Sequence, residues 1–355
     1  MMERRADEGL AFALRYENVA WYEDGIVRIL DRRIYPAVSF VTCKSHGEVA
    51  RAIADMVTQS AGPFTACAMG MALAAWECRD KTEAEQLAYL KQAAFTLSHA
   101  RPTTVGRMEL ITGGCLAAAE RALAEGVSVP EAIRDHTIHA NNVRYRKVER
   151  MGAFLADLVP DGGKVLTQCY AETVLGMFLK AARAQGKQLK LFCAETRPYF
   201  QGARLTATVC HDMGFDTTVI TDNMPAFVME REGIDLFTSA ADVICLDGTV
   251  VNKVGTFQIA IAANHLGVPY YVTGAPDKGM HSRADVTIEM RDPEFTLQAM
   301  GVRTAAEGVK GYYPAFDITP PSLVTGVVTD QGIYRPSELD KYFETGALGE
   351  FEMVI

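Results

Sequence analysis

Five short β-rich runs recur at nearly constant spacing in the second half of the chain. They cover residues 165–167, 189–193, 217–221, 242–246 and 268–273, and their starts are 24, 28, 25 and 26 residues apart. That spacing is the length of a strand, a helix and two loops, and the stretches between the runs show helical patterns. Because parallel strands need crossover connections, which are usually helices, the alternation predicts a doubly wound, Rossmann-like parallel sheet with helices on both faces.

The first half of the chain follows a different pattern. Within residues 21–30, Glu23, Asp24 and Gly25 separate two apolar stretches, as in a tight hairpin, so a small antiparallel sheet is expected there. Residues 45–152 are rich in alanine, with apolar residues at helical spacing. We therefore predict an α/β protein with two domains: residues 1–152 form a small β-sheet and a helical domain, and residues 153–355 form the Rossmann-like domain.

Composition narrows the range of functions. The chain has 355 residues, 44 of them acidic and 35 basic, a net charge of -9 and 49% hydrophobic residues. This composition excludes a disordered chain and a dedicated nucleic-acid-binding protein. Eight cysteines lie far apart without a CxxC pair, which indicates reduced thiols and no structural zinc site. The apolar windows are shorter than the roughly 20 residues of a membrane span, and no secretory signal is present, so we expect a cytoplasmic protein that does not bind membranes.

Polar residues follow the predicted strands. In open α/β sheets, ligands bind beyond the carboxyl ends of the strands. The residues expected there are Gln168, Cys169, residues 195–197, Asp222, Asn223, Asp247 and residues 273–278. They are mostly polar, which is typical of a site for a polar small molecule. The motifs GxGxxG, GxxxxGK[ST] and GxSxG are absent, so the sequence supports neither a dinucleotide site, a P-loop nor a nucleophile elbow.

Several longer runs are specific enough to indicate a family. They are MGMALAA at residues 69–75, ARPTTV at 100–105, AETRPYFQGARLT at 194–206, ITDNMPAFVM at 220–229, VVNKVGTF at 250–257 and EGVKGYYPAFDITPP at 307–321. These runs resemble the S-methyl-5-thioribose-1-phosphate isomerase family, whose relatives include the regulatory subunits of initiation factor 2B and the ribose-1,5-bisphosphate isomerases. The resemblance covers nearly the whole chain. It implies a homodimer that converts a 5-substituted ribose 1-phosphate to the ribulose 1-phosphate, in methionine salvage or a related 5-deoxypentose salvage, without metal or other cofactor.

Such a reaction requires two catalytic groups. Because the phosphate sits on the anomeric carbon, the ring oxygen must be protonated as its bond to C1 breaks, and a second group must help hydrogen to move from C2 to C1. The run TQCYAE corresponds to the family's THCNAG, so the resemblance implies that Cys169 is catalytic; a buried structural thiol is the alternative. ICLDGTVVNK departs from the family's GADR loop and lacks its arginine. We assign the acid to Asp247, with a turn-forming aspartate before glycine as the alternative.

The resemblance also implies a set of phosphate-binding residues: Arg101, Gln201, Asn252 and Lys253. Lys253 precedes Gly255 and Thr256 at a predicted helix start, where free amide donors and the helix dipole favour an anion. The family's RGAP arginine is absent. QSAGPF stands in its place and leaves Ser60 and backbone amides as the expected partners.

Two other functions remain open at this point. The initiation-factor relatives are regulatory, so the chain is alternatively a non-catalytic sensor of a sugar phosphate or nucleotide. A third possibility is an assembly scaffold. The retained residues Cys169, Arg101, Gln201 and Lys253 favour the enzyme. The changed runs around the site, including TGAPDKG in place of the family's APLST type, favour an altered substituent on C5.

Overall fold

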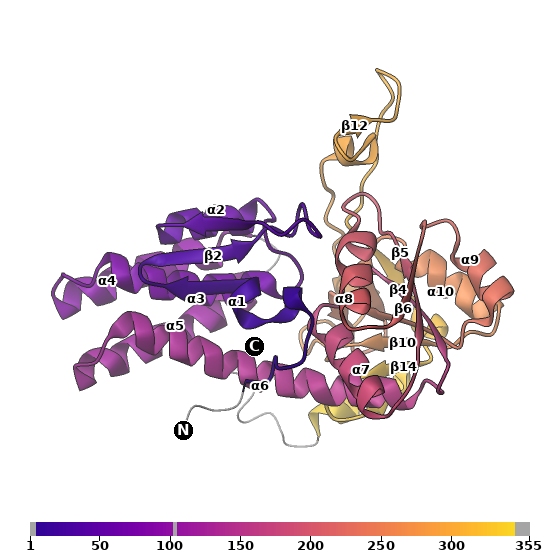
Figure 1. Ribbon diagram of the computed structural model, residues 1–355, viewed down its shortest axis with the longest axis horizontal. Coiled ribbons are helices and arrows are strands. Elements are labelled where there is room, and N and C mark those ends of the chain that lie inside the picture. Colours follow the sequence, from indigo (N-terminus) through magenta and orange to yellow (C-terminus); the bar gives the residue numbers. More distant parts are fainter. Residues whose placement is uncertain (1–4, 102–104, 345–355) are drawn as a thin grey trace. The chain divides into compact units, whose positions relative to one another are not determined.

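A computed structural model describes residues 5–101 and 105–344 (Figure 1). The chain forms two compact units that divide between Lys147 and Val148. The predicted fold class is confirmed: the first unit has helices and a small antiparallel sheet, and the second has a large, mostly parallel sheet. Among the described residues, no helix combines the length and the apolar character needed to cross a membrane.

The first unit begins with short elements and a three-stranded antiparallel sheet. These are η1 (Phe12–Leu14), α1 (Tyr16–Val19), β1 (Ala20–Glu23), β2 (Ile26–Leu30) and β3 (Phe40–Cys43), and the strand order is β1-β2-β3. Asp24 and Gly25 form the two-residue turn between β1 and β2, with φ values of 47° and 76°. Positive φ at both positions is what a type I′ hairpin turn requires. The hairpin predicted from residues 21–30 is therefore confirmed.

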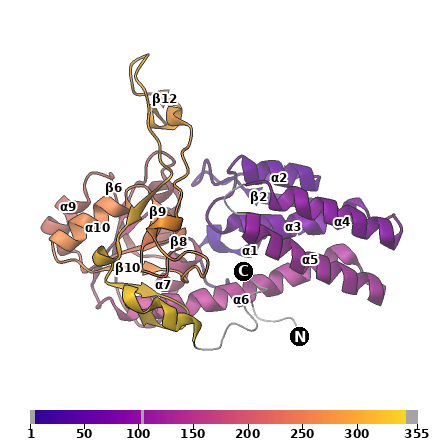
Figure 2. The same ribbon diagram turned by 180° about the vertical axis from the view of Figure 1, so that it is seen from behind.

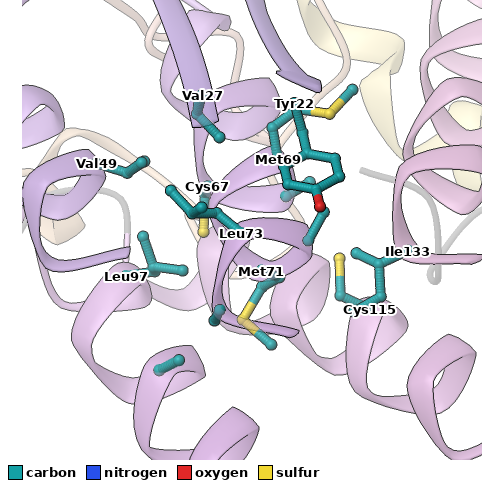
Figure 3. Packing of buried hydrophobic residues seen from close by; sticks show 14 of the residues in the cluster. Tyr22, Val27, Val49, Cys67, Met69, Met71, Leu73, Leu97, Cys115 and Ile133 are labelled. Atoms are coloured by element: carbon teal, nitrogen blue, oxygen red, sulfur yellow. The ribbon is translucent and has the colours of Figure 1, made fainter. Parts of the chain in front are cut away.

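Five helices complete the first unit. They are α2 (His46–Ala54), α3 (Gly62–Glu77), α4 (Glu83–Ser98), α5 (Val105–Glu125) and α6 (Val129–Asp157), which continues into the second unit. The central helix is α3, whose small and apolar residues are buried on almost every side. Figure 3 shows Met69 and Leu73 of α3 packed among side chains of the sheet and of the other helices. A helix that is apolar all round needs such a buried position.

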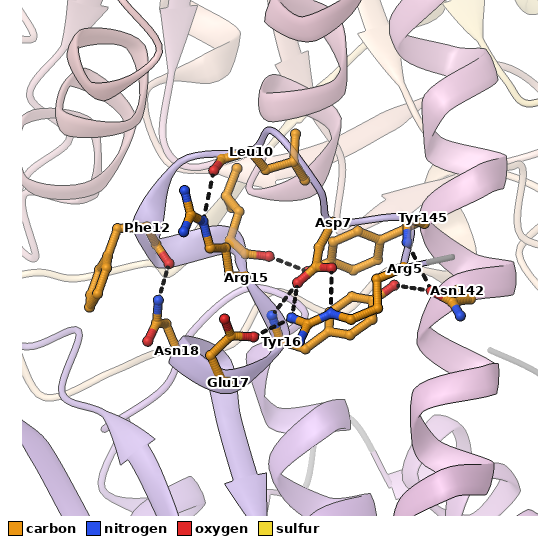
Figure 4. A network of polar contacts seen from close by, with 12 residues as sticks. Arg5, Asp7, Leu10, Phe12, Arg15, Tyr16, Glu17, Asn18, Asn142 and Tyr145 are labelled. Carbon is orange, nitrogen blue, oxygen red and sulfur yellow. Dashed lines mark hydrogen bonds and ion pairs between the residues drawn. The ribbon is translucent and has the colours of Figure 1, made fainter. Parts of the chain in front are cut away.

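Polar contacts attach the beginning of the chain to α6 (Figure 4). The Asp7 carboxylate is buried and accepts hydrogen bonds from the Arg5 guanidinium and, at 2.8 Å, from the backbone N–H of Tyr16. Asn142 of α6 accepts from the backbone N–H of Ala6 and from the Tyr16 hydroxyl, at 2.9 and 2.8 Å. These bonds satisfy the polar groups that the segment buries.

The main sheet of the second unit has seven strands. They are β4 (Lys164–Gln168), β5 (Lys190–Ala194), β6 (Asp216–Ile220), β7 (Leu236–Ala240), β10 (Tyr270–Thr273), β14 (Gly326–Val328) and β15 (Ile333–Tyr334). Their order is β15-β14-β10-β7-β4-β5-β6, and every pair is parallel except β14 with β15. From β4 the chain first moves outward through β5 to β6 and then returns to β7 on the other side of β4. The strand order therefore reverses between β4 and β7.

Helices cover both faces of this sheet. One group contains α7 (Thr173–Ala184), the π-helix η3 (Gly202–Thr206) and α8 (Ala207–Asp212). The other contains α9 (Pro225–Val228), the π-helix η4 (Met229–Gly233) and α10 (Thr256–His265). Figures 1 and 2 show the two groups on opposite faces. The doubly wound arrangement predicted from the spacing of the β-rich runs is confirmed.

One strand was wrongly predicted. The run at residues 242–246 is not in the main sheet; the sheet strand is β7, which ends at Ala240. Val243–Ile244 form β8 in a separate antiparallel sheet with β9 (Val250–Lys253) and β13 (Phe316–Thr319), in the order β13-β9-β8. The sequence LFTSA of β7 looks too polar for a buried strand, but Thr238 donates to the Tyr271 carbonyl oxygen at 2.8 Å, and its hydroxyl is thereby satisfied.

The remaining described elements are short. They are η5 (Arg283–Asp285), η6 (Pro293–Thr296), β11 (Gln298–Ala299), β12 (Val302–Arg303), η7 (Pro321–Leu323) and η8 (Pro336–Phe343). β11 and β12 form an antiparallel pair. Figures 1 and 2 both show β12 on an arm that extends away from the main sheet of the second unit.

Candidate active site

The site begins at the point where the strand order reverses. Cys169 follows β4, and Asp242 lies two residues after the end of β7. These two strands are neighbours in the sheet, and their parallel direction brings both carboxyl ends to the same edge. The crevice at such a switch point is where open α/β sheets bind their ligands. A thiol and a carboxylate therefore flank the position that the fold favours for a ligand.

Cys169 is held in a strained backbone conformation. Its φ is 64°, in the left-handed region that costs energy for a residue with a side chain. Its backbone N–H donates to Thr196 Oγ1 at 2.9 Å, and its carbonyl oxygen accepts from the Thr206 hydroxyl. These bonds from two neighbouring segments fix the conformation. Strain that the surroundings maintain in this way is typical of functional residues.

The charges around the thiol determine its protonation. Burial raises the pKa of the Cys169 thiol to about 11; the positive charges of Lys253 and Arg291 lower it, and the carboxylate of Asp242 raises it. A thiol with this pKa is protonated at neutral pH. Cys169 therefore carries a proton that it can donate, and the two cations favour the thiolate that would result.

Lys253 and Asn252 are fixed by the small antiparallel sheet. Lys253 is buried, its Nζ donates to the Ala315 carbonyl oxygen at 3.0 Å, and Nζ lies 4.7 Å from the centre of the Phe316 ring. Burial lowers the pKa of Lys253. Asn252 Nδ2 donates to Thr256 Oγ1 at 3.0 Å. The strand thus holds a cation whose charge acts on Cys169.

Hydrogen bonds through Thr256 also connect β9 to β4. Thr256, the first residue of α10, donates from Oγ1 to Gln168 Oε1 at 2.9 Å, and Gln168 Nε2 donates to the Val254 carbonyl oxygen at 3.2 Å. Gln168 directly precedes Cys169. The Asn252–Lys253 pair and the thiol are therefore parts of one hydrogen-bonded framework.

The expected anion site at the start of α10 is occupied by the protein itself. Asp317 of β13 accepts hydrogen bonds from the backbone N–H of Gly255 at 2.7 Å and from that of Phe257 at 3.2 Å. Burial raises the pKa of Asp317 to about 6. The backbone amide of Gly255 is therefore not free for an anion, contrary to the expectation from the sequence. A carboxylate 62 residues away, which no local pattern connects to the helix, already fills this position.

The two candidate carboxylates, Asp242 and Asp247, are both exposed but lie in different surroundings. Asp247 is exposed in the turn between β8 and β9, where its Oδ1 accepts from the backbone N–H of Thr249 at 2.8 Å. This is the turn-forming role that the sequence left as an alternative. Asp242 follows the true sheet strand, and its charge acts on both Cys169 and Lys253. Asp242 is therefore a second candidate for the catalytic carboxylate, beside Asp247.

Gln201 lies near the same edge of the sheet. It directly precedes η3 and is buried, and among the described residues its Oε1 has no hydrogen-bond partner. The preceding loop is fixed by Asp222, whose carboxylate accepts from the backbone N–H groups of Thr196 and Arg197 at 2.8 and 2.7 Å. A buried amide with an unsatisfied oxygen is a polar group available to a ligand.

Three charged residues of the site were missed by the sequence analysis. Besides Asp242 they are Arg291 and Glu289, which form an ion pair with Nε and Oε1 2.9 Å apart. The Arg291 guanidinium lies 5.6 Å from the centre of the Phe316 ring, on which Lys253 also packs. A signal for Asp242 was present: it follows Ser-Ala-Ala, a run of small residues that can end a buried strand. For Arg291, the sequence gives no local signal of the contact with Glu289 and Phe316.

The other two predicted site residues belong to the first unit. Ser60 lies in the turn before α3, with a φ of 59°, and Arg101 follows α4 and is partly buried. Cys169, Gln201 and the Asn252–Lys253 pair belong to the second unit. Within the second unit, the charges of Lys253 and Asp242 reach Cys169, whereas Asp247 lies in the turn between β8 and β9.

Comparisons with known proteins agree on one family. Residues 60–336 match the initiation factor 2 subunit family. A methylthioribose-1-phosphate isomerase of Chloroflexus aurantiacus is 38% identical over 341 residues, which cover 91% of this chain and 96% of that protein. The crystal structure of 5-methylthioribose 1-phosphate isomerase from Pyrococcus horikoshii OT3 superposes with a TM-score of 0.82 at 30% identity, over 93% of this chain and 96% of that one. Subunit delta of translation initiation factor eIF-2B from A. fulgidus gives a TM-score of 0.77 at 31% identity, over 90% and 96%. The chain therefore belongs to the initiation factor 2 subunit family, in the group that includes the methylthioribose-1-phosphate isomerases.

Proposed function

We propose that the protein is an aldose–ketose isomerase that converts a 5-substituted ribose 1-phosphate, of the 5-methylthioribose 1-phosphate type, to the ribulose 1-phosphate. The observation that carries this proposal is the pair of Cys169 and Asp242 on either side of the switch point of the sheet. The reaction needs a proton donor and a proton acceptor at one sugar, and this pair supplies one of each. The metabolic role that corresponds to this reaction is the salvage of 5-methylthioribose 1-phosphate to methionine.

The raised pKa of the thiol supports one division of the two roles. Cys169 is protonated at neutral pH and donates its proton to the ring oxygen as the bond between that oxygen and C1 breaks. The hydrogen on C2 moves to C1, and the Asp242 carboxylate accepts the proton released as the C2 carbonyl forms. Lys253 and Arg291 stabilise the transient thiolate. Transfer of that proton from Asp242 back to Cys169 restores the enzyme, so protons balance over one turnover.

The phosphate contacts are part of the same proposal. Lys253 supplies a positive charge, and Asn252 and Gln201 supply amide groups in the second unit. For Arg101 and Ser60, which belong to the first unit, phosphate binding stays a prediction from the sequence. A phosphate dianion favours such a mixture of charged and neutral donors.

Two aspartate variants test the assignment of the base. We expect Asp242→Asn to lower kcat by roughly 10²- to 10⁴-fold, the usual contribution of a general acid or base. Asp247→Asn serves as the matched control and is expected to remain within about threefold of the wild type, because its carboxylate only forms a turn. Proton NMR with 5-methylthioribose, 5-deoxyribose and ribose 1-phosphates follows the loss of the anomeric signal. Loss of activity in Asp247→Asn alone would restore that residue as the catalytic carboxylate, and no conversion of any substrate by the wild type would contradict the proposed function.

We also propose that the protein works as a homodimer in the cytoplasm. On the arm of the second unit, Met300, Val302 and Tyr312 expose 72%, 66% and 76% of their surfaces. Apolar side chains gathered in this way are typical of an interface, and a second copy is the proposed occupant. All eight cysteines are free thiols, which suits a reducing compartment. Light scattering of the wild type and of Val302→Asp tests the dimer, and an unchanged mass in the variant would place the interface elsewhere.

A further inference from the structure

The first unit contains a cavity between three of its helices. Its walls come from α3, α5 and α6, and every residue that lines it belongs to the first unit. On α6 the lining positions are 136–137, 140–141 and 144, which share one face of the helix. The free space measures about 40 Å³, which is room for roughly three water-sized groups. A ligand of this cavity is therefore a molecule of few atoms.

Asn141 brings an unsatisfied hydrogen-bond donor to the cavity. Its side chain lines the wall, and only 6% of the residue is exposed. Its Oδ1 accepts from the Thr65 hydroxyl at 3.4 Å, whereas its Nδ2 has no hydrogen-bond partner among the described residues. Buried amide groups nearly always have a partner. A donor that the described protein groups leave unpaired at a cavity points to a bound molecule with an acceptor atom.

Arg144 brings a positive charge to the same cavity. It follows Asn141 by three residues on α6, so the two side chains lie on neighbouring turns of one face. The guanidinium carbon lies 5.2 Å from the centre of the Tyr145 ring, and Arg144 forms no ion pair with another described residue. A guanidinium keeps its charge in proteins. The cavity therefore has a permanent cation without a carboxylate partner in the described parts of the chain.

The rest of the lining is neutral. No acidic side chain is among the described residues that form the walls. Burial, together with the charges of Arg121 and His139, lowers the pKa of His136, so this imidazole is neutral at pH 7. Phe64 and Ile111 add apolar surface. One positive charge, one amide donor and apolar walls favour a small anion with an apolar part.

We propose that this cavity binds a short-chain monocarboxylate of the size of formate or acetate. The carboxylate pairs with the Arg144 guanidinium, whose planar donors match its two oxygens, and it accepts a hydrogen bond from Asn141 Nδ2. The alkyl end of the ligand lies against Phe64 and Ile111. This inference goes beyond the proposed function and does not depend on it.

The test uses acetate and the full chain. Saturation-transfer NMR of the acetate methyl protons measures binding, and acetamide has the same shape without the charge. We expect acetamide to bind at least roughly tenfold more weakly than acetate, and Arg144→Met to weaken acetate binding by roughly 10- to 100-fold, as for a lost charged interaction. Asn141→Leu should weaken it in the same direction. Arg134→Met is the matched control, because Arg134 lies on α6, pairs with Asp135 and does not line the cavity.

A variant that fills the cavity tests the site without removing a polar group. Ala140 lines the wall, so Ala140→Leu should abolish acetate binding while circular dichroism shows an unchanged helical content. Acetate should also raise the urea midpoint of the first unit relative to chloride at equal concentration, followed by the fluorescence of Trp21 and Trp76.

Several results would overturn the proposal. They are equal binding of acetate and acetamide, unchanged acetate affinity in folded Arg144→Met or in Ala140→Leu, and an equal loss in Arg134→Met. Absence of acetate binding by the wild type would show that the cavity holds water alone, and it would overturn the proposal as well.

Discussion

Replacing Asp317 by asparagine should change how the stability of the second unit depends on pH. Burial raises the pKa of this carboxyl from 3.8 to about 6. In the folded protein the group binds a proton more tightly than in the unfolded chain. Its contribution to stability is therefore fully present below the unfolded pKa and is lost as the pH rises through about 6.

The magnitude follows from the size of the shift. A difference of about two pKa units corresponds to about 3 kcal/mol of unfolding free energy between acid and neutral pH, at about 1.4 kcal/mol per unit. About 2 kcal/mol of this falls between roughly pH 4.5 and 7.5. Asparagine does not titrate. The stability of Asp317→Asn relative to the wild type should therefore rise by about 2 kcal/mol over this interval. Weaker bonds to Gly255 and Phe257 add an effect that does not change with pH.

Hydrogen exchange is the suitable assay, because both tryptophans, Trp21 and Trp76, belong to the first unit and fluorescence would report on that unit. Mass spectrometry of peptides from α10 and β13, in mild urea and corrected for intrinsic exchange rates, gives the local opening free energy of each protein at each pH. Subtracting the two series removes the other titrating groups. Parallel curves for the two proteins, or a difference that falls as the pH rises, would refute the argument that burial dominates at Asp317.

Three further predictions concern single residues. Iodoacetamide should modify Cys169 slowly at pH 7.5 and faster up to about pH 11, because burial raises the thiol's pKa; a rate that levels off near pH 8 would contradict this. Asp7→Asn should destabilise the first unit by about 1–3 kcal/mol, since it weakens buried hydrogen bonds from charged and backbone donors. Urea unfolding followed by tryptophan fluorescence measures this loss of stability, and a change within experimental error would contradict the prediction. Gly202→Ala should cost at least about 1–3 kcal/mol, because the added Cβ would lie 1.7 Å from the Ala194 carbonyl oxygen. Gly113→Ala, where nothing lies within 4 Å, should instead stabilise its helix by about 0.5–1 kcal/mol. Urea unfolding followed by circular dichroism measures both glycine variants, because Gly202 belongs to the second unit and both tryptophans to the first. Equal effects of the two substitutions would show that crowding is not the cause.

The parts of the fold that follow from local patterns were predictable from the sequence. The hairpin turn at Asp24 and Gly25 and four of the five β-rich runs carry their signals within a few residues. β7 was missed because its buried hydroxyls are satisfied by neighbouring strands that come later in the chain. The error placed the strand end at Leu246 instead of Ala240, so only Asp247, and not Asp242, was considered as a catalytic carboxylate from the sequence.

The least predictable feature of the site is Asp317. Its contact with Gly255 depends on the antiparallel pairing of β13 with β9, in which Asp317 lies opposite Asn252. Such a pairing between distant segments leaves no periodic mark in either of them.

The sheet itself sets the spacing between the thiol and the carboxylate. Cys169 and Asp242 follow β4 and β7, two neighbouring strands that are joined by main-chain hydrogen bonds. In this pairing Leu166 lies opposite Phe237. Main-chain pairing does not depend on the identity of side chains. The loops around this edge are therefore free to mutate without disturbing the distance between the thiol and the carboxylate. Under the proposed mechanism, a lineage can in this way change which sugar it accepts while it keeps the same chemistry.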